Sequence, residues 1–241
     1  MPSIKNDYDT LASRWQLEIK FGPTHRIKRK ILERIFKNIK SKFLCDIGCG
    51  SGLYSHLLQN KNFLYAVDLS SKALQLAGKD LKKTALVCAD ANYLPFKDNF
   101  FDGVLLLDIL EHIEDDTRVI REVYRTLNKG GFVIFSVPQD NRLFSKIDIK
   151  NKHYRRYSKK ELLKKFSPFT IRYLSSVGFP LMRIYLQLIM NSPQPEESFL
   201  RKNKNLTKIF SNLLFWLFHF DLIFKGFPWG VLIFGVIEKN E

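Results

Sequence analysis

Short apolar runs, most of them ending in an acidic residue, recur through the middle of the chain. They cover 43–48, 63–68, 84–90, 101–108 and 131–138. Segments with the apolar spacing of helices separate them near 52–60, 71–81 and 114–128, and Asn and Gly residues at 128–131 predict a helix cap there. Buried strands that alternate with helices form a parallel sheet covered on both faces. The pattern therefore predicts an α/β, doubly wound sheet.

The two flanks of this region have a different character. Residues 9–40 have helical spacing, interrupted at Gly22-Pro23. After Pro138 the pattern predicts further elements: a short helix at 158–166, a strand at 170–176, an apolar helix at 179–190, a loop at 191–198 and a last strand at 229–239.

Residues 206–224 are apolar on almost every side. A transmembrane helix needs roughly 20 such residues. Lys208, His219 and Asp221 interrupt this stretch. It is therefore interpreted as a buried or membrane-surface helix rather than a membrane span.

Composition and charge narrow the classes of partner. The 241 residues are 45% hydrophobic, which excludes a disordered or collagen-like chain, and the net charge is +15. Residues 1–42 carry +7 and 132–172 carry +8, whereas 43–131 carry −2, so the flanks would attract anions. The start of the chain has no signal-peptide pattern and three cysteines (Cys45, Cys49, Cys88) lack metal or redox spacing, which predicts a cytoplasmic protein.

A glycine-rich turn follows the first predicted strand, from Asp46 to Gly52. Glycines there allow a tight turn and a close approach of backbone to ligand. The spacing is neither the dinucleotide fingerprint G-x-G-x-x-G nor a phosphate loop with its lysine. Asp68 ends the second strand, where a carboxylate can accept hydrogen bonds from ribose hydroxyls, and Asp90 ends the third. These acids suit a nucleoside cofactor without pyrophosphate.

Five segments in register resemble the class I S-adenosylmethionine-dependent methyltransferases, in particular their type 11 group. They are LCDIGCGSG, VDLS, CADANYLPF, FDGVLLLDILEHIEDD and LNKGGFVIFSVP, within residues 43–138. The resemblance implies a Rossmann-like, mostly parallel sheet with an antiparallel last strand, a helical N-terminal extension and an apolar helical insertion before that strand. It also implies S-adenosylmethionine as methyl donor and S-adenosylhomocysteine as product. We expect one domain, 1–241: a helical cap (1–42), the cofactor-binding core (43–138), an acceptor-side segment (139–228) and the last strand (229–241).

The resemblance also implies roles for individual residues. The expected cofactor-binding set is Asp46, Gly48, Cys49, Gly50 and Gly52 for the methionine part, Asp68 with Leu69 for the ribose, Asp90 with Ala91 for the adenine, Asp108 near the methyl group and Tyr8 as a lid. For Tyr8, a plain core or capping role remains an equal alternative.

Methyl transfer to a protonated acceptor needs a base, and two histidines are candidates. His112 and His153 are the possible general bases, each with the alternative of a structural hydrogen bond. His153, Arg155, Arg156 and Tyr157 are expected at an anionic acceptor. The D-x-x-E-H arrangement that ends at His112 is similar to a motif of ubiquinone-pathway O-methyltransferases in which a divalent metal is implicated. It is frequent in relatives without that role, so no metal is expected.

The acceptor itself stays open. No Asn/Asp-Pro-Pro-Tyr/Phe motif and no Pro-Cys pair is found, which favours O-methylation over N- or C-methylation. The apolar insertion and basic flanks favour a small-molecule, lipid or lipid-linked glycan acceptor, and they suggest a cytoplasmic protein that is peripheral at the inner membrane face. An RNA methyltransferase and a non-catalytic cofactor-binding or membrane-associated scaffold are the alternatives, and nucleic acid is the weaker partner because the aromatics are not interleaved with basic residues. The oligomeric state is not indicated.

Overall fold

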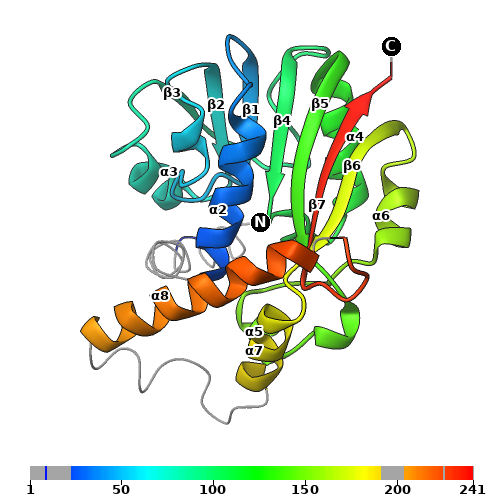
Figure 1. Cartoon of the computed structure of the whole chain (residues 1–241). Coiled ribbons are helices and arrows are strands. Elements are labelled where there is room, and N and C mark those ends of the chain that lie inside the picture. Colours follow the sequence, from blue (N-terminus) through cyan, green and yellow to red (C-terminus); the bar gives the residue numbers. More distant parts are fainter. Residues whose placement is uncertain (1–8, 10–22, 191–203, 225, 241) are drawn as a thin grey trace.

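The computed structural model describes residues 9, 23–190, 204–224 and 226–240. Seven strands form one sheet in the order β3-β2-β1-β4-β5-β7-β6 (Figure 1). They are β1 Phe43–Ile47, β2 Phe63–Asp68, β3 Thr84–Cys88, β4 Phe101–Leu107, β5 Leu127–Pro138, β6 Phe169–Val177 and β7 Leu232–Lys239. Strands β1 to β5 pair in parallel, and β7 is antiparallel to both β5 and β6. The predicted Rossmann-like sheet with an antiparallel last strand is confirmed.

Helices cover both faces of this sheet. They are α2 Pro23–Phe36, α3 Ser71–Ala77, α4 Asp116–Thr126, α5 Lys146–Lys150, α6 Lys159–Lys165, α7 Leu181–Met190 and α8 Lys204–Phe220, with the 3-10 turns Ser55–Leu57, Leu110–His112, Asn141–Leu143 and Asp221–Phe224. Helices α7 and α8 lie between β6 and β7, where the insertion is predicted. Within the described ranges, no helix combines the length and apolar character that crossing a bilayer requires.

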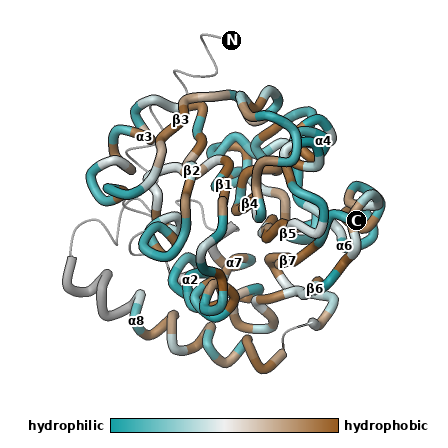
Figure 2. The backbone as a smooth tube through the Cα atoms, turned by 90° about the horizontal axis from the view of Figure 1, so that it is seen from above, coloured by the Kyte–Doolittle hydropathy of each residue, from teal (hydrophilic) through white to brown (hydrophobic). Residues whose placement is uncertain are grey.

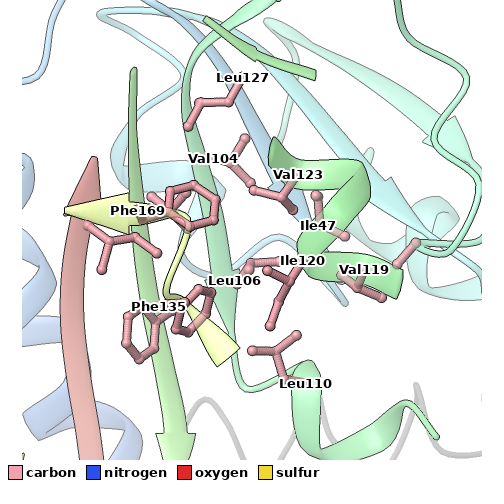
Figure 3. Packing of buried hydrophobic residues seen from close by; sticks show 14 of the residues in the cluster. Ile47, Val104, Leu106, Leu110, Val119, Ile120, Val123, Leu127, Phe135 and Phe169 are labelled. Carbon is pink, nitrogen blue, oxygen red and sulfur yellow. The ribbon is translucent and has the colours of Figure 1, made fainter. Parts of the chain in front are cut away.

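Alternate side chains of the central strands point to opposite faces of the sheet and pack into two separate hydrophobic cores. Val104 and Leu106 of β4 face α4 and pack in one cluster with its Val119 and Val123 (Figure 3). Leu105 and Leu107 face the other way and pack in a second cluster against α2. A strand buried on both faces reads as one continuous apolar run, which is why β4 could be recognised in the sequence.

A third apolar cluster attaches α8 to the body of the molecule. Leu214 and Phe218 of α8 pack with Ile27 of α2, Met182 of α7 and Val231 before β7. Figure 1 shows α8 running beneath α2, beyond the carboxyl ends of the parallel strands. Figure 2 shows α8 at the rim of the molecule with much of its length hydrophobic.

Several element boundaries differ from the sequence-based expectation. The stretch 52–60 forms turns and one 3-10 helix instead of an α-helix: the amides of Leu57 and Leu58 donate to carbonyls three residues back, and the Ser55 hydroxyl donates to the buried Asp46 carboxylate. Helix α4 ends at Thr126, and Leu127 pairs with Phe101 of β4, so residues 128–131 belong to β5 and form no helix cap. The last strand begins at Leu232 instead of residue 229.

Candidate active site

A cavity of about 660 Å³ opens where the carboxyl ends of the parallel strands meet. The chain turns outward from β1 through β2 to β3 and then returns to β4 on the other side of β1. Ligands of open α/β sheets bind at such a switch point. Residues that follow β1, β2, β3 and β4, together with side chains of α2 and of the segment after β5, line the cavity.

The glycine-rich turn forms the floor at β1. Gly48 and Gly50 have φ values of +73° and +53°, which disfavour other residues. A Cβ atom on Gly48 would lie 2.2 Å from Cδ1 of Ile109, whereas Gly50 has no heavy atom within 4 Å of that position. The turn is fixed to β2 by the amides of Gly48 and Cys49, which donate to the Val67 carbonyl. Gly50 therefore presents open backbone to a ligand.

Two of the residues predicted to bind the methionine part lie behind the cavity wall. Asp46 is buried beneath the turn and accepts a hydrogen bond from Ser55, and burial raises its pKa to about 7. A Cβ on Gly52 would lie 2.6 Å from Cδ1 of Leu81, inside the protein. Neither residue lines the cavity, so both support the turn from behind.

Asp68 connects the turn to the end of β2. Its Oδ2 accepts from the Gly50 amide at 2.8 Å and its Oδ1 from the Ser70 amide at 2.9 Å. Burial raises the pKa of this carboxyl despite those two donors. The carboxylate faces the cavity beside Leu69, at the position suited to a pair of ribose hydroxyls.

The segment after β3 supplies the next part of the wall. Asp90 accepts from the backbone and side-chain amides of Asn92 through Oδ1. Ala91 lies beside them, and Oδ1 of Asn92 is buried with no partner among the described residues. Arg118 of α4 stacks over the Tyr93 ring at 3.9 Å. The prediction missed Asn92, Tyr93 and Arg118, although Asn92 follows directly on the predicted pair.

These residues fit S-adenosylmethionine. An exposed backbone turn, a carboxylate at the end of β2 and an unpartnered buried amide oxygen after β3 would take its amino-acid, ribose and adenine parts in that order. No phosphate-binding lysine stands at the turn, and the carboxylates favour a sulfonium cation.

The opposite part of the cavity, the acceptor half, is built around Asp108. Its Oδ1 accepts from the Ser136 hydroxyl at 2.9 Å, and Oδ2 is ion-paired with the Lys28 ammonium, which α2 brings in. Burial opposes ionisation of Asp108, but Lys28, together with His25 and the Ser136 hydroxyl, holds the pKa of this carboxyl below its usual value. His25 of the same helix hydrogen-bonds to Tyr54 at 3.1 Å, and burial lowers its pKa to about 4. Sequence reasoning missed His25, Lys28 and Tyr54.

The two candidate bases meet in this half. The rings of His112 and His153 are perpendicular with centroids 4.6 Å apart, and both line the cavity. Burial, and then the neighbouring His153, lower the pKa of His112 to about 3. His153 Nδ1 lies 2.8 Å from Oδ1 of Asp148, and Arg156 holds both oxygens of that carboxylate at 3.0 Å. His153 is therefore oriented by a carboxylate, whereas burial makes His112 a weak base.

Glu111 completes a cluster with these histidines. One ligand atom from each of Glu111, His112 and His153 lies within 4.8 Å of the others, so the three could hold a divalent metal. Glu111 is buried, and burial followed by the Asp108 charge raises its pKa well above the usual value. The expectation that no metal is bound stays a prediction.

Three residues predicted to bind the acceptor have internal partners. Arg156 is buried against Asp148, and the Tyr157 hydroxyl donates to Asp116 at 2.7 Å inside the core. Arg155 pairs with Asp116 at 3.2 Å and donates to the Glu114 carbonyl. None of the three lines the cavity. Of residues 153–157, called the HYRRY segment below, His153 and Tyr154 do. The charges of the two arginines are paired within the protein and fix the segment, since burying an unpaired charge is costly.

The other predicted site residues that the structure describes all line the cavity. They are Gly48, Cys49, Gly50, Asp68, Leu69, Asp90, Ala91, Asp108, His112 and His153. Tyr8 lies outside the described residues.

Similar sequences include known methyltransferases. Residues 45–135 match the methyltransferase domain family. An uncharacterized protein of Methanocaldococcus jannaschii is 33% identical over 76% of this chain and 79% of its own length. The demethylmenaquinone methyltransferase of Thermotoga maritima is 32% identical over 58% of this chain, and the ubiquinone biosynthesis O-methyltransferase of Hydrogenovibrio crunogenus is 28% identical over the same share. The matches span 65% and 62% of those two enzymes, somewhat less than two thirds of their length.

A solved structure shows the same fold. The N-methyltransferase NodS of Bradyrhizobium japonicum, in complex with S-adenosyl-L-homocysteine, is 13% identical and superimposes with a TM-score of 0.62 over 93% of this chain and 91% of its own. The fold, the site and the relatives agree: the chain belongs to the class I S-adenosylmethionine-dependent methyltransferases.

Proposed function

We propose that this methyltransferase methylates a hydroxyl oxygen of a small-molecule or lipid acceptor, with His153 as the general base. The observation that carries the proposal is the Asp148–His153 pair at the wall of the acceptor half. A carboxylate that accepts from Nδ1 leaves Nε2 of the neutral ring as the proton acceptor. This is the arrangement expected of a base that removes a hydroxyl proton.

Asp148 is positioned for this role by its own contacts. It is buried, and although burial opposes ionisation, His153 and Arg156 hold its pKa at about 2. It also caps α5 through the Ser145 amide, at 2.9 Å. Asp148 therefore stays ionised at neutral pH and orients the His153 ring.

The chemistry then needs little more than positioning. When bound, S-adenosylmethionine would supply a methyl group on a sulfonium sulfur, and the neutral thioether S-adenosylhomocysteine would be the leaving group. His153 would take the hydroxyl proton as the acceptor oxygen bonds to the methyl carbon, while the electron pair of the broken C–S bond stays on sulfur. The cavity walls would position the acceptor and exclude water, which lowers the barrier further.

Two features support a small or lipid-linked acceptor over RNA. The acceptor half combines polar groups with the apolar Ile109, Ile113, Pro138 and Leu232. The basic HYRRY segment, which could otherwise contact a phosphate backbone, has both arginines engaged internally. Two relatives are named for demethylmenaquinone and for ubiquinone biosynthesis, and we extend a quinone-type acceptor to this chain.

The proposal is tested with purified protein, methyl-labelled S-adenosylmethionine and a panel of phenols, catechols and hydroxyquinones. We expect label in a methyl ether, identified by mass spectrometry, and about a 100-fold or greater loss of kcat in His153→Gln with S-adenosylhomocysteine binding retained. His56→Gln is the matched control, because His56 contacts Gln59 and does not line the cavity. A chelator should leave the rate unchanged. Methylation of amines alone, or full activity of His153→Gln, would overturn the assignment.

A further inference from the structure

Helix α8 has two apolar faces, and the body of the molecule buries only one of them. Leu214 and Phe218 point into the third cluster. The other face carries an apolar ridge, defined here as Leu213, Trp216, Leu217, Phe220 and Ile223. The ridge continues from α8 into the 3-10 turn Asp221–Phe224. Trp216 is 67% exposed and Ile223 is 70% exposed. A soluble surface does not normally gather large apolar side chains on one helix face, so the ridge marks a contact surface.

Aromatic rings extend the ridge beyond the helix. Phe220 contacts Phe224 with ring centroids 5.5 Å apart, and Phe224 contacts Phe227 at 6.1 Å. Phe227 contacts Trp229 at 6.2 Å, and both are about half exposed. Trp and Phe are typical of the apolar face of helices that lie at the boundary between water and lipid.

Cations border the ridge on the side of α2. Arg26, Lys30 and Arg34 follow one another at intervals of four along that helix and form a basic row. Arg26 donates to Oδ1 of Asn212 at 2.8 Å and lies 4.1 Å over the Phe215 ring. Lys30 Nζ lies 3.4 Å from the His219 ring, and after burial the charges of Lys30 and Arg34 lower the pKa of His219. Arg26 and Lys30 therefore contact α8, and Arg34 lies one turn further along the same helix.

The ridge has no exposed carboxylate to oppose an anionic surface. Within 204–224 and 226–237 the only acidic residue is Asp221, which is fully buried. Its two oxygens accept from the amides of Leu181 and Met182 at 2.9 and 2.7 Å, so it fixes the start of α7. On α2 the exposed Glu33 is paired with Arg29. Apolar side chains beside a row of cations, with no exposed acid on α8, complement a bilayer surface that contains anionic lipid.

We propose that the apolar ridge and the basic row dock the enzyme on an anionic membrane surface. The surface is separate from the cavity, so the proposal does not depend on which oxygen is methylated. It is nevertheless only one helix away from the acceptor half, because α2 packs on α8 and sends His25 and Lys28 into the cavity. An acceptor carried in the bilayer would therefore meet the enzyme on the side where its acceptor half is built.

The test measures binding of the full chain to vesicles by co-sedimentation, without turnover. We expect binding to phosphatidylcholine vesicles that contain about one third phosphatidylglycerol, and little to pure phosphatidylcholine. Trp216→Ser with Ile223→Ser should lower the partition coefficient about tenfold or more, and Lys30→Gln with Arg34→Gln should reduce binding to the anionic vesicles only. Phe63→Ser with Leu163→Ser is the matched control: both residues are exposed, on β2 and α6, away from α8.

A second measurement reports insertion directly. A variant with Trp15→Phe and Trp229→Phe keeps only Trp216, whose emission should shift to the blue on anionic vesicles and be quenched by brominated lipid. S-adenosylhomocysteine binding should be equal in every variant, which separates loss of docking from misfolding and from failure of the proposed methylation. Binding unaffected by the ridge variants would overturn the proposal. So would a dimer in sedimentation that Ile223→Ser dissociates, or RNA binding that depends on the basic row while vesicles are ignored.

Discussion

Asp108 occupies a backbone conformation that non-glycine residues rarely adopt, with φ of +56° directly after β4. Its amide donates to the Ser136 carbonyl at 2.9 Å, and its carboxylate is held by Ser136 and Lys28. Such a conformation persists only where the surrounding contacts fix it. Here they turn the carboxylate into the acceptor half, beside the turn at Gly48. The strain and the buried ion pair are thus properties of the site.

The ion pair has a measurable consequence for stability. Asp108→Asn leaves the Lys28 ammonium, whose side chain is only 5% exposed, buried without a counter-charge. We expect the free energy of unfolding, measured in urea, to fall by about 3 kcal/mol. Adding Lys28→Met to that variant should recover most of the loss, because no unpaired charge remains. Equal stability of Asp108→Asn and the parent would show that the pair is solvated in solution.

Elements buried on both faces could be predicted from the sequence, and those that depend on distant contacts could not. The apolar run of β4 and the exact bounds of β2 follow from local pattern. The α-helix expected at 52–60 is replaced by turns and a 3-10 helix, where Ser55 is bonded to Asp46 of β1, a contact that the local pattern does not show. A carboxylate that ends a strand is found by its position along the chain, which is how Asp68 could be predicted.

Side chains that reach the cavity from elsewhere leave no such signal. Lys28 lies on α2, 80 residues from its partner Asp108, and its role appears only once α2 is packed on the sheet. The HYRRY segment shows the opposite error: its charges suggested an anionic acceptor, but Asp148 and Asp116 neutralise the arginines. A basic segment in a sequence indicates that acidic groups will be attracted to it, but only the fold shows whether those groups belong to a ligand or to the protein itself.

Shortening a side chain to alanine should affect the stability of the protein differently on the two faces of α8. Phe218 is 1% exposed and packs against Tyr185 with ring centroids 5.3 Å apart. Phe218→Ala should lower the free energy of unfolding by about 3–5 kcal/mol, because it leaves a cavity in the third cluster. Trp216→Ala, two residues away on the ridge, should change it by less than about 0.5 kcal/mol. Urea unfolding of both variants checks this, and similar losses would mean that the ridge is packed against protein in solution.

At the scale of the whole molecule, the cofactor-binding part of the chain is nearly neutral, and the net positive charge lies in the segments before and after it. Residues 43–131 have a net charge of −2 within a total of +15. Acids gather at the cofactor site, where they suit a sulfonium. The described cations that remain unneutralised by carboxylates include Lys30 and Arg34, beside the apolar ridge. One surface is thus suited to an anionic environment while the cavity is suited to a cationic donor.

This division predicts where the methyl group goes. Incubation of the protein with cell extract and methyl-labelled S-adenosylmethionine, followed by separation into organic, nucleic-acid and aqueous fractions, should place most label in the organic fraction. His153→Gln should abolish that label, since it removes the base. The ridge variant Trp216→Ser with Ile223→Ser should lower it while leaving methylation of a water-soluble phenol unchanged, because only access from the bilayer is lost. Label in RNA would instead mean that the basic segments bind a phosphate backbone. Label confined to water-soluble products would mean that the acceptor does not come from the membrane.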